Sequence, residues 1–438
     1  MSVHQIPSHF STRRVDVVVT HPVHQHAYET AAAAQDAGLL REFVTAFYAR
    51  SDTAAGLRAS RLLPRGFRET LRRYLSRRHH PDLDGRLVTT MSWRQLAAVA
   101  GRHPALARVA DGVLGSGWFE RGFDRAVARR LRLDRATPPA IVHAFEGAAL
   151  ETLKAARSRG SKTVLDVPSA HEQLRAVTAA EGARVDHFDT RRVQEERRWA
   201  DYLFAPSVIV ERCLLEHGAS PETIVVIPLG VDPTRFSPAT DRVRGGLFRF
   251  LYAGAIAPQK GIRYLLDAWR AMDLRDAELV LVGPLGRGGE ELLRDMPVGC
   301  RWVGAVGKSE VDRWFKAADA LVLPSLSDSW GLVVAEGLAC GLPVVTTEAC
   351  GFPVEDGIQG YVVPPRDAAV LGAAMRSLHD APDHAAAMGV AGRELILANY
   401  TWAHYRRRIQ AAYEAIFVGS NVTVAVASVD AAELRSCG

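Results

Sequence analysis

The segment from Ala320 to Thr347 reads ALVLPSLSDSWGLVVAEGLACGLPVVTT, and its pattern decides the fold class. It begins with a short apolar run, passes through a polar loop, and enters a helix-length segment at Gly331. A second apolar run follows Gly341. A buried strand, a short loop, a helix and another buried strand are typical of a parallel sheet in an α/β protein.

The same alternation extends along nearly the whole chain of 438 residues. We predict strands at residues 15–20, 43–47, 87–91, 140–145, 163–167, 202–206 and 224–228, and then at 248–253, 279–282, 302–303, 320–323, 343–346 and 361–363. A break rich in Pro, Gly and charge at Phe236–Leu247 separates the two series. The expected fold is α/β, with two Rossmann-like doubly wound domains that face each other across a cleft.

Domain boundaries follow from these breaks. We expect an N-terminal domain over residues 1–236, with a helix-rich basic insertion at about 51–136, and a C-terminal domain over residues 237–400. Residues 401–417 form one further helix with a single stripe of apolar and aromatic side chains, which are Tyr405, Ile409, Ala412, Tyr413 and Ile416. The small residues at 418–438 show no clear pattern, and we expect a flexible tail there.

The loop before Gly331 has the features of an anion-binding site. The first backbone N–H groups of a helix lack intrahelical partners, and the helix dipole favours negative charge at that end. Gly331 would let a ligand approach the backbone closely, while Leu332 and Val333 would contribute N–H donors. Ser327 lies in the polar loop before them. A diphosphate is the ligand that this arrangement favours.

Two acids and one lysine could complete the site. Asp328 and Glu336 can face one pocket and are better acceptors for sugar hydroxyls than ligands for phosphate, because like charges repel. Lys260 precedes Gly261 at a helix start and could neutralise a diphosphate. The alternatives are that Asp328 is a helix cap, that Glu336 forms a local ion pair, and that Lys260 is solvated.

The run DSWGLVVAEGLACGLPVV at 328–345 resembles the E-x7-E signature of family-4 retaining glycosyltransferases, which have the GT-B fold. Asp328 and Glu336 take the two acidic places, although the first is one carbon shorter than glutamate. The runs VIPLGVDPTRF at 226–236 and FLYAGAIAPQKGIRYLLDAW at 250–269 resemble further elements of that family. The resemblance covers roughly residues 200–417, and it identifies the last helix as one that crosses back onto the first domain.

This resemblance implies transfer of a hexosyl group from a nucleoside diphosphate sugar, UDP- or GDP-linked, to an acceptor hydroxyl with retention of configuration. No metal and no further cofactor are required. The implied catalytic residues are Lys260, Asp328, Glu336 and His143, and the implied donor-binding residues are Gly254, Lys260, Gly283, Ser327, Gly331, Leu332, Val333 and Glu336. Ala255 stands where the family usually has an arginine.

The first domain matches the family less closely. Three histidines, including His24 and His26, crowd the first strand-to-helix loop. The run IVHAFEGAALETLKAA at 141–156 keeps His143 but has Phe145 where the family often has a second histidine. We predict His24, His26, Glu146 and His171 on the acceptor side, and each could instead be a structural residue. The rival functions are a GT-B epimerase or phosphorylase and a catalytically silent sugar-nucleotide-binding protein.

Composition limits the cellular compartment and the partners that can be expected for the protein. The chain has no apolar run long enough to span a membrane, its N-terminus lacks the pattern of a signal peptide, and its five cysteines form no CxxC pair. We therefore expect a cytoplasmic protein without a disulfide framework or zinc site. Eight arginines and one acid at Arg58–Arg78 predict an anionic membrane surface or anionic acceptor as a partner, or else a solvated face. Nucleic acid is not expected; the acceptor is a glycan, glycolipid or small molecule.

Overall fold

The computed structural model describes residues 16–23, 26–48, 78–91, 117–183, 189–239, 246–307 and 310–436, and side chains up to residue 429. The elements of its first half are β1 Val17–His21, α1 Ala27–Asp36, β2 Leu40–Thr45, β3 Val88–Thr90, α6 Trp118–Leu133, β4 Ile141–Phe145, α7 Leu150–Ser158, β5 Lys162–Asp166, α8 His171–Ala180, α9 Thr190–Trp199, β6 Tyr202–Ala205, α10 Val208–Glu216 and β7 Ile224–Val226. Every strand predicted for this half is confirmed, with ends shifted by at most three residues.

The second half begins with β8 Phe248–Ala253, the 3-10 turn η4 Pro258–Lys260, α11 Ile262–Met272, β9 Ala277–Val282, α12 Gly289–Leu292, β10 Cys300–Gly304 and α13 Val311–Lys316. It continues with β11 Ala320–Leu323, α14 Leu332–Ala339, β12 Val344–Thr347, β13 Gly360–Val363, α15 Ala368–Asp380, α16 Pro382–Asn399, α17 Trp402–Val418 and α18 Val422–Ser436. The strands predicted here are confirmed as well, and the segment quoted first folds as β11, α14 and β12.

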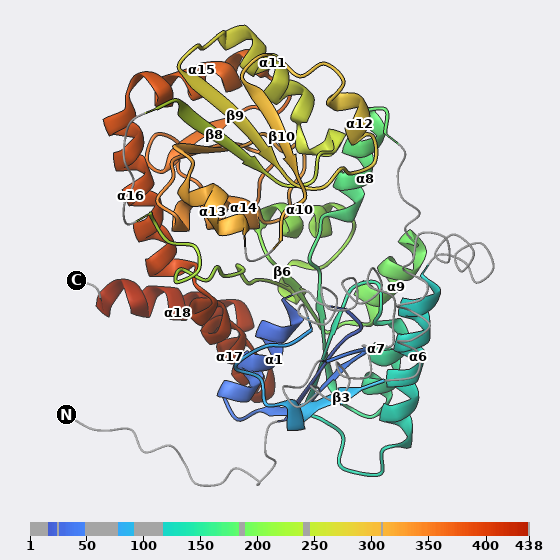
Figure 1. Ribbon diagram of the computed structural model, residues 1–438. Helices are drawn as coiled ribbons and strands as arrows, with labels where there is room; N and C mark the ends of the chain where they lie inside the picture. The colour runs from blue at the N-terminus through green and yellow to red at the C-terminus, as the bar shows by residue number, and fades with distance from the viewer. Residues whose placement is uncertain are drawn as a thin grey trace, which may run out of the picture. The chain divides into compact units, whose positions relative to one another are not determined.

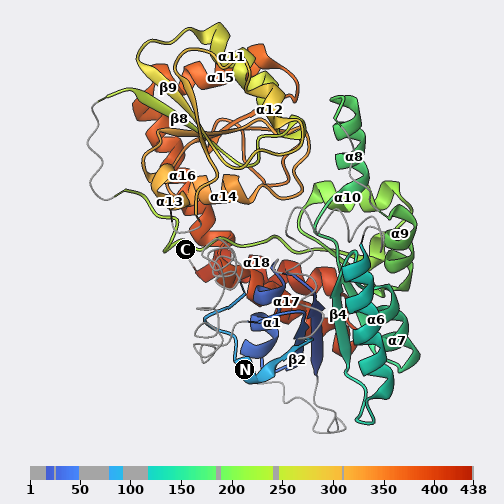
Figure 2. The same cartoon turned by 45° about the vertical axis from the view of Figure 1, so that its right-hand side comes forward.

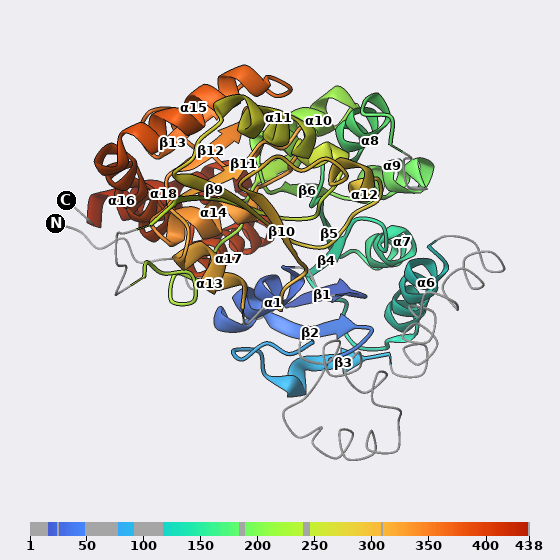
Figure 3. The ribbon, with the colours of Figure 1, turned by 45° about the horizontal axis from the view of Figure 1, so that its top comes forward.

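Two sheets organise these elements (Figure 1). The first has the strand order β3-β2-β1-β4-β5-β6-β7, and its neighbours β1, β2 and β3 lie side by side in Figure 3. The second has the order β10-β9-β8-β11-β12-β13, with each neighbouring pair parallel. In the second sheet the chain moves outward from β8 in one direction and from β11 in the other. The boundary between β8 and β11 is therefore the topological switch point, where such sheets bind ligands.

The chain divides into two compact units, each made of several segments. The first comprises residues 1–166, 189–202 and 409–422, and the second comprises residues 167–188, 203–408 and 423–438. Both have cores of the expected kind, with α6 packed on α7 in the first unit (Figure 2) and α11 packed on α15 in the second. The division falls inside α17, where the predicted stripe is confirmed: Tyr405, Ile409, Ala412, Tyr413 and Ile416 are all at most 2% exposed.

One expectation about the C-terminal tail needs correction. The tail beyond residue 418 is not irregular, because Val422–Ser436 forms α18. Val422 and Val426, one helical turn apart, are each 4% exposed, so an apolar contact supports the helix. In the described part of the range 51–136, the predicted strand at 87–91 is present as β3, which pairs with β2, and the helix α6 belongs to the core.

The predicted basic surface at Arg58–Arg78 lies outside the described residues except for its last member. Arg78 is 3% exposed, so its side chain does not belong to a solvated face. None of the described helices combines the length and apolar character needed to cross a bilayer.

Candidate donor site and a buried histidine cluster

The carboxyl ends of β8 and β11 are joined by close backbone packing. Leu326 N–H donates to the Gln259 carbonyl oxygen over 2.9 Å, which pairs the loop after β11 with η4. Gly261 has φ of +71°, and a Cβ there would lie 1.9 Å from the Pro324 carbonyl oxygen. Only glycine therefore permits this contact. The consequence is that Lys260, the residue before Gly261, is held beside the loop that carries Asp328.

Lys260 and Asp328 form the central polar pair of this site. Lys260 Nζ donates to Asp328 Oδ2 over 2.5 Å, and the two side chains are 25% and 18% exposed. The other oxygen, Oδ1, accepts a 2.9 Å hydrogen bond from Gly331 N–H. Asp328 thus joins the lysine to the start of α14. Asp328 does not cap α14 itself, because the helix has no side-chain cap and its N-cap residue is Gly331, whereas its contact with a donor sugar stays a prediction.

The start of α14 presents unused backbone donors. Val334 and Ala335 donate to the Gly331 carbonyl oxygen, whereas Leu332 N–H and Val333 N–H have no hydrogen-bond partner among the described residues. Leu332 is 42% exposed and Val333 is half-buried, so this turn is open to solvent. Open amides at the positive end of a helix, with a lysine close by, can bind an anion.

Packing inside the protein also requires glycine at position 331, in addition to the close ligand approach that the sequence suggested. Its φ is +79°, and a Cβ would lie 2.4 Å from Cys350 Sγ. Cys350 is 7% exposed, and burial raises the pKa of its thiol to about 12. The glycine therefore lets the first turn of α14 rest directly on an unreactive, buried thiol.

The remaining donor-side predictions lie around the same sheet edge. Gly254 and Gly283 end β8 and β9, and a Cβ on Gly283 would lie 1.8 Å from the Gly254 carbonyl oxygen. Ser327 is 5% exposed, so little of it can reach a ligand. Glu336 lies on α14, is half-buried, and interacts with another group of the protein. Ala255, in place of the family's arginine, offers its carbonyl oxygen to the Tyr252 hydroxyl at 2.7 Å.

Sequence analysis missed Ser329 and the helices that hold it. Ala170 N–H donates to Ser329 Oγ over 3.0 Å, and Ser207 Oγ donates to the Ser329 carbonyl oxygen over 2.5 Å. Ala170 immediately precedes α8 and Ser207 immediately precedes α10. The loop that carries Asp328 is therefore supported by the starts of two helices from the chain's first half. No local pattern marks such contacts, which join residues more than a hundred positions apart.

A second polar cluster lies in the first unit, where β1, β4 and β5 end. His26 Nε2 is 2.9 Å from Asp166 Oδ2, and His143 Nε2 is 3.7 Å from the same oxygen. His143 Nδ1 contacts the Tyr413 hydroxyl at 2.8 Å. Asp166 Oδ1 is buried and has no hydrogen-bond partner among the described residues. Asp166 lies near the carboxyl end of the strand predicted at 163–167, so its position at this sheet edge was a signal that the sequence carried.

Burial and charge shift the pKa values in this histidine cluster. Burial lowers the pKa of His21 to about 4, and burial also lowers the pKa of His143. Burial alone would raise the pKa of Asp166, but the charge and hydrogen bond of His26 and the nearby His143 ring lower it to about 2. At neutral pH the cluster therefore combines an ionised carboxylate with neutral His21 and His143.

The predicted catalytic residue His143 and the predicted acceptor-side residue Glu146 both have buried side chains. His143 is 0% exposed, so it can contact a substrate only through a neighbour such as Asp166. The Glu146 side chain is also fully buried, in a 2.7 Å ion pair with Arg197. His171 starts α8 and belongs to the second unit, and its place on the acceptor side stays a prediction. His24 is not among the described residues, and His26 is the prediction that joins the cluster.

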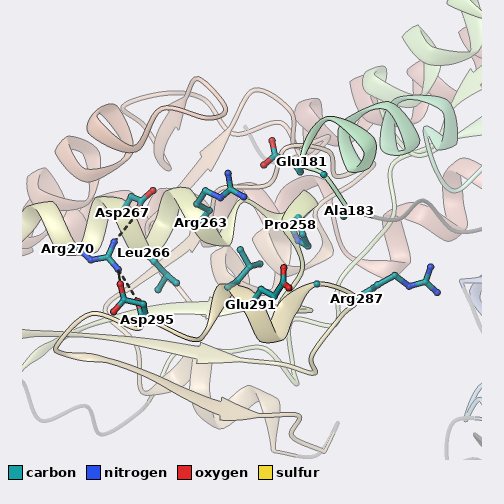
Figure 4. Close-up of a pocket in the computed structure, with 13 residues that line it drawn as sticks. Glu181, Ala183, Pro258, Arg263, Leu266, Asp267, Arg270, Arg287, Glu291 and Asp295 are labelled. Carbon is teal, nitrogen blue, oxygen red and sulfur yellow. Dashed lines mark hydrogen bonds and ion pairs between the residues drawn. The ribbon is translucent and has the colours of Figure 1, made fainter.

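A separate open cavity of about 510 Å³ lies between α11, α12 and the end of α8 (Figure 4). Its lining mixes acids and arginines, and Arg270 is paired with Asp267 and Asp295. It includes Pro258 of η4 but none of the predicted donor residues. The cavity is therefore distinct from the groups assembled around Lys260.

Solved structures share this fold along most of the chain. A sucrose-phosphate synthase from Thermosynechococcus elongatus superposes with a TM-score of 0.61 and 18% identity, covering 93% of this chain and 100% of that one. Alr3699/HepE from Anabaena in complex with UDP has a TM-score of 0.61 and 15% identity, with 90% and 98% covered. The chain has the GT-B fold: two Rossmann-like α/β domains built on parallel sheets.

The sequence relationship is concentrated in the second domain, where residues 248–381 match the family model of the glycosyl transferases group 1. A D-inositol 3-phosphate glycosyltransferase from Corynebacterium kroppenstedtii is 32% identical over 229 residues, which are 47% of this chain and 51% of that protein. An MMP alpha-(1->4)-mannosyltransferase from Mycolicibacterium hassiacum is 29% identical over 226 residues, or 50% and 54%. The chain spans about half the length of these relatives. The similarity to the glycosyl transferases group 1 thus lies in residues 248–381.

Proposed function

We propose that the protein is a retaining glycosyltransferase that moves a hexosyl group from a nucleoside diphosphate sugar to an acceptor hydroxyl. The observation that carries this proposal is the Lys260–Asp328 pair at the switch point of the second sheet. Its carboxylate also binds Gly331 N–H, so the lysine is tied to the open amides at the start of α14. A cation and helix amides at one sheet edge suit a diphosphate.

The chemistry assigned to these groups is electrostatic. The bond between the anomeric carbon and the diphosphate oxygen breaks, and negative charge grows on the leaving diphosphate. Lys260 and the amides of Leu332 and Val333 stabilise that charge as it develops, which lowers the barrier. The acceptor oxygen bonds to the anomeric carbon from the same face, and its proton passes to a diphosphate oxygen. No separate base is needed, so Phe145 is compatible with the reaction.

The sugar and ribose contacts are assigned to the two acids of the site. We place Glu336 on the ribose hydroxyls, because it follows the open amides along α14. Asp328 would contact the transferred sugar, which requires its oxygens to exchange part of their present bonding for sugar hydroxyls. UDP is the first nucleotide to test, since the fold is shared with a protein solved with UDP. GDP is the alternative.

The acceptor is assigned to the buried histidine cluster of the first unit. Asp166 Oδ1 lacks a hydrogen bond among the described residues, and a substrate hydroxyl could supply one. His26 would share that hydroxyl, while His143 and Tyr413 position Asp166 and His26 from behind. The relative named for inositol 3-phosphate is consistent with a small polyhydroxyl acceptor, and a glycan or glycolipid acceptor presents the same groups.

Calorimetric titration with UDP, GDP and the corresponding monophosphates tests the donor site directly. We expect a nucleoside diphosphate to bind better than its monophosphate, and Lys260→Met to weaken diphosphate binding at least roughly tenfold. Lys316→Met is the matched control, because Lys316 pairs with Asp312 at 3.5 Å on α13 and lies outside the site. Equal affinity in the Lys260 variant and the wild type would contradict the assignment, as would a complete lack of nucleotide binding.

A further inference from the structure

Three potential metal ligands from α8 and α10 meet in the second unit. Cys213 Sγ is 3.5 Å from Glu172 Oε2 and 3.9 Å from His217 Nδ1. The ligand atoms of all three residues lie within 4.8 Å of one another. Cys213 is 4% exposed, Glu172 is half-buried and His217 is exposed. Figure 3 shows α8 and α10 side by side, so the group bridges two helices.

The spacing of these atoms suits a tetrahedral zinc ion. With zinc bonds of about 2.3 Å to sulfur and about 2.1 Å to nitrogen or oxygen, the sulfur lies about 3.6 Å from each neighbouring ligand. The observed separations of 3.5 and 3.9 Å are close to this value. Cys213 lies on α10 and His217 is the residue that ends this helix, four positions later, and the two ligand atoms are 3.9 Å apart. A thiolate, an imidazole and a carboxylate together favour zinc over calcium or magnesium.

Glu172, Cys213 and His217 form the hydrogen bonds that are expected of metal ligands in their protonated, metal-free state. The Cys213 thiol donates to Glu172, and His217 Nδ1–H donates to the Cys213 carbonyl oxygen over 2.7 Å. Metal binding would remove the thiol proton and free a ring nitrogen of His217 as a ligand. Binding would therefore release protons and become tighter as the pH rises.

We propose that Glu172, Cys213 and His217 form a zinc-binding site, with water as the fourth ligand. The role of the zinc ion would be structural, because its ligands come from α8 and from the end of α10 and would hold these two helices together. These helices begin next to Ala170 and Ser207, which both bind Ser329 beside Asp328. A zinc ion would thus stiffen the support of the predicted donor loop, a consequence that rests on the proposed function. The zinc site itself does not depend on it.

Sequence analysis excluded zinc because no CxxC pair was present. The ligand set instead combines Cys213-x3-His217 with an acid 41 residues earlier in the chain. Only the contact between α8 and α10 brings that acid to the pair.

Zinc titration of the full-length, chelator-treated protein against a chromophoric competitor tests the site. We expect one strong site per chain, and cobalt in its place should show a thiolate-to-cobalt charge-transfer band. Cys213→Ser should abolish that band and weaken zinc binding at least roughly tenfold, since loss of supporting contacts alone often costs that much. His217→Gln changes an exposed side chain, keeps the fold, and should weaken zinc binding similarly.

Cys340→Ser is the matched control, because Cys340 is equally buried but lies at the end of α14. It should bind zinc and cobalt as the wild type does. The site is refuted if the wild type binds no zinc at micromolar concentration, or if the Cys213 and His217 variants retain full affinity. Since no nucleotide is added, these results are independent of whether a nucleotide binds.

Discussion

The contact between Gly331 and Cys350 makes a quantitative prediction about Gly331→Ala. The new Cβ would lie 2.4 Å from Cys350 Sγ, and the residue would have to keep φ at +79°. A left-handed backbone costs an alanine about 1–2 kcal/mol, and forcing an extra carbon into a packed site costs about 1–3 kcal/mol. We therefore expect a loss of about 2–5 kcal/mol in the free energy of unfolding of the second unit.

Gly357 provides a matched control for the backbone part of this cost. It has the same φ of +79°, and a Cβ there would meet nothing within 4 Å. Gly357→Ala should lose only about 1–2 kcal/mol. Urea unfolding followed by circular dichroism measures both variants. If the two substitutions cost the same, the steric argument fails.

Removal of the opposing sulfur tests the clash itself. The double variant Gly331→Ala with Cys350→Ala should be more stable than the sum of the two single losses by at least about 1 kcal/mol. Relative to Cys350→Ala alone, the double variant should lose about as much free energy of unfolding as Gly357→Ala loses relative to the wild type. Only the backbone strain of an alanine at position 331 is then left. Strict additivity of the two single substitutions would show that the Cβ does not press on Cys350.

Three further predictions concern the first unit. Because the pKa of His21 falls from 6.5 to about 4 on burial, folding stability should decline by up to about 3 kcal/mol as the pH drops from 6.5 to 4, and His21→Gln should flatten this slope in acid titrations followed by circular dichroism. Glu196 is buried and accepts N–H bonds from the start of α7, so Glu196→Ala should cost about 2–4 kcal/mol in urea unfolding and Glu196→Gln less. Tyr413→Phe removes the hydroxyl that contacts His143 and should cost about 1 kcal/mol by the same measurement; no loss would show that this contact is not stabilising.

Local pattern was sufficient for the strands and for the edge of the sheet where the proposed donor site lies. The strand runs, the stripe on α17 and the strand–loop–helix segment around Gly331 each depend on residues close together in the chain. Periodicity reports which face of an element is buried, because apolar side chains must leave water on that face. The parallel arrangement then follows, and it places the loops after β8 and β11 at the same sheet edge.

Tertiary structure alone decided which side chains meet. His26 with Asp166, Lys260 with Asp328, and Cys350 behind Gly331 are contacts between segments that no spacing rule connects. The same is true of α18, whose small residues carry little pattern until Val422 and Val426 find an apolar surface. The physical reason is that a hydrogen bond or a steric contact requires ångström-level placement in space. Hydrophobic pattern specifies burial, and many arrangements of polar partners are compatible with the same burial.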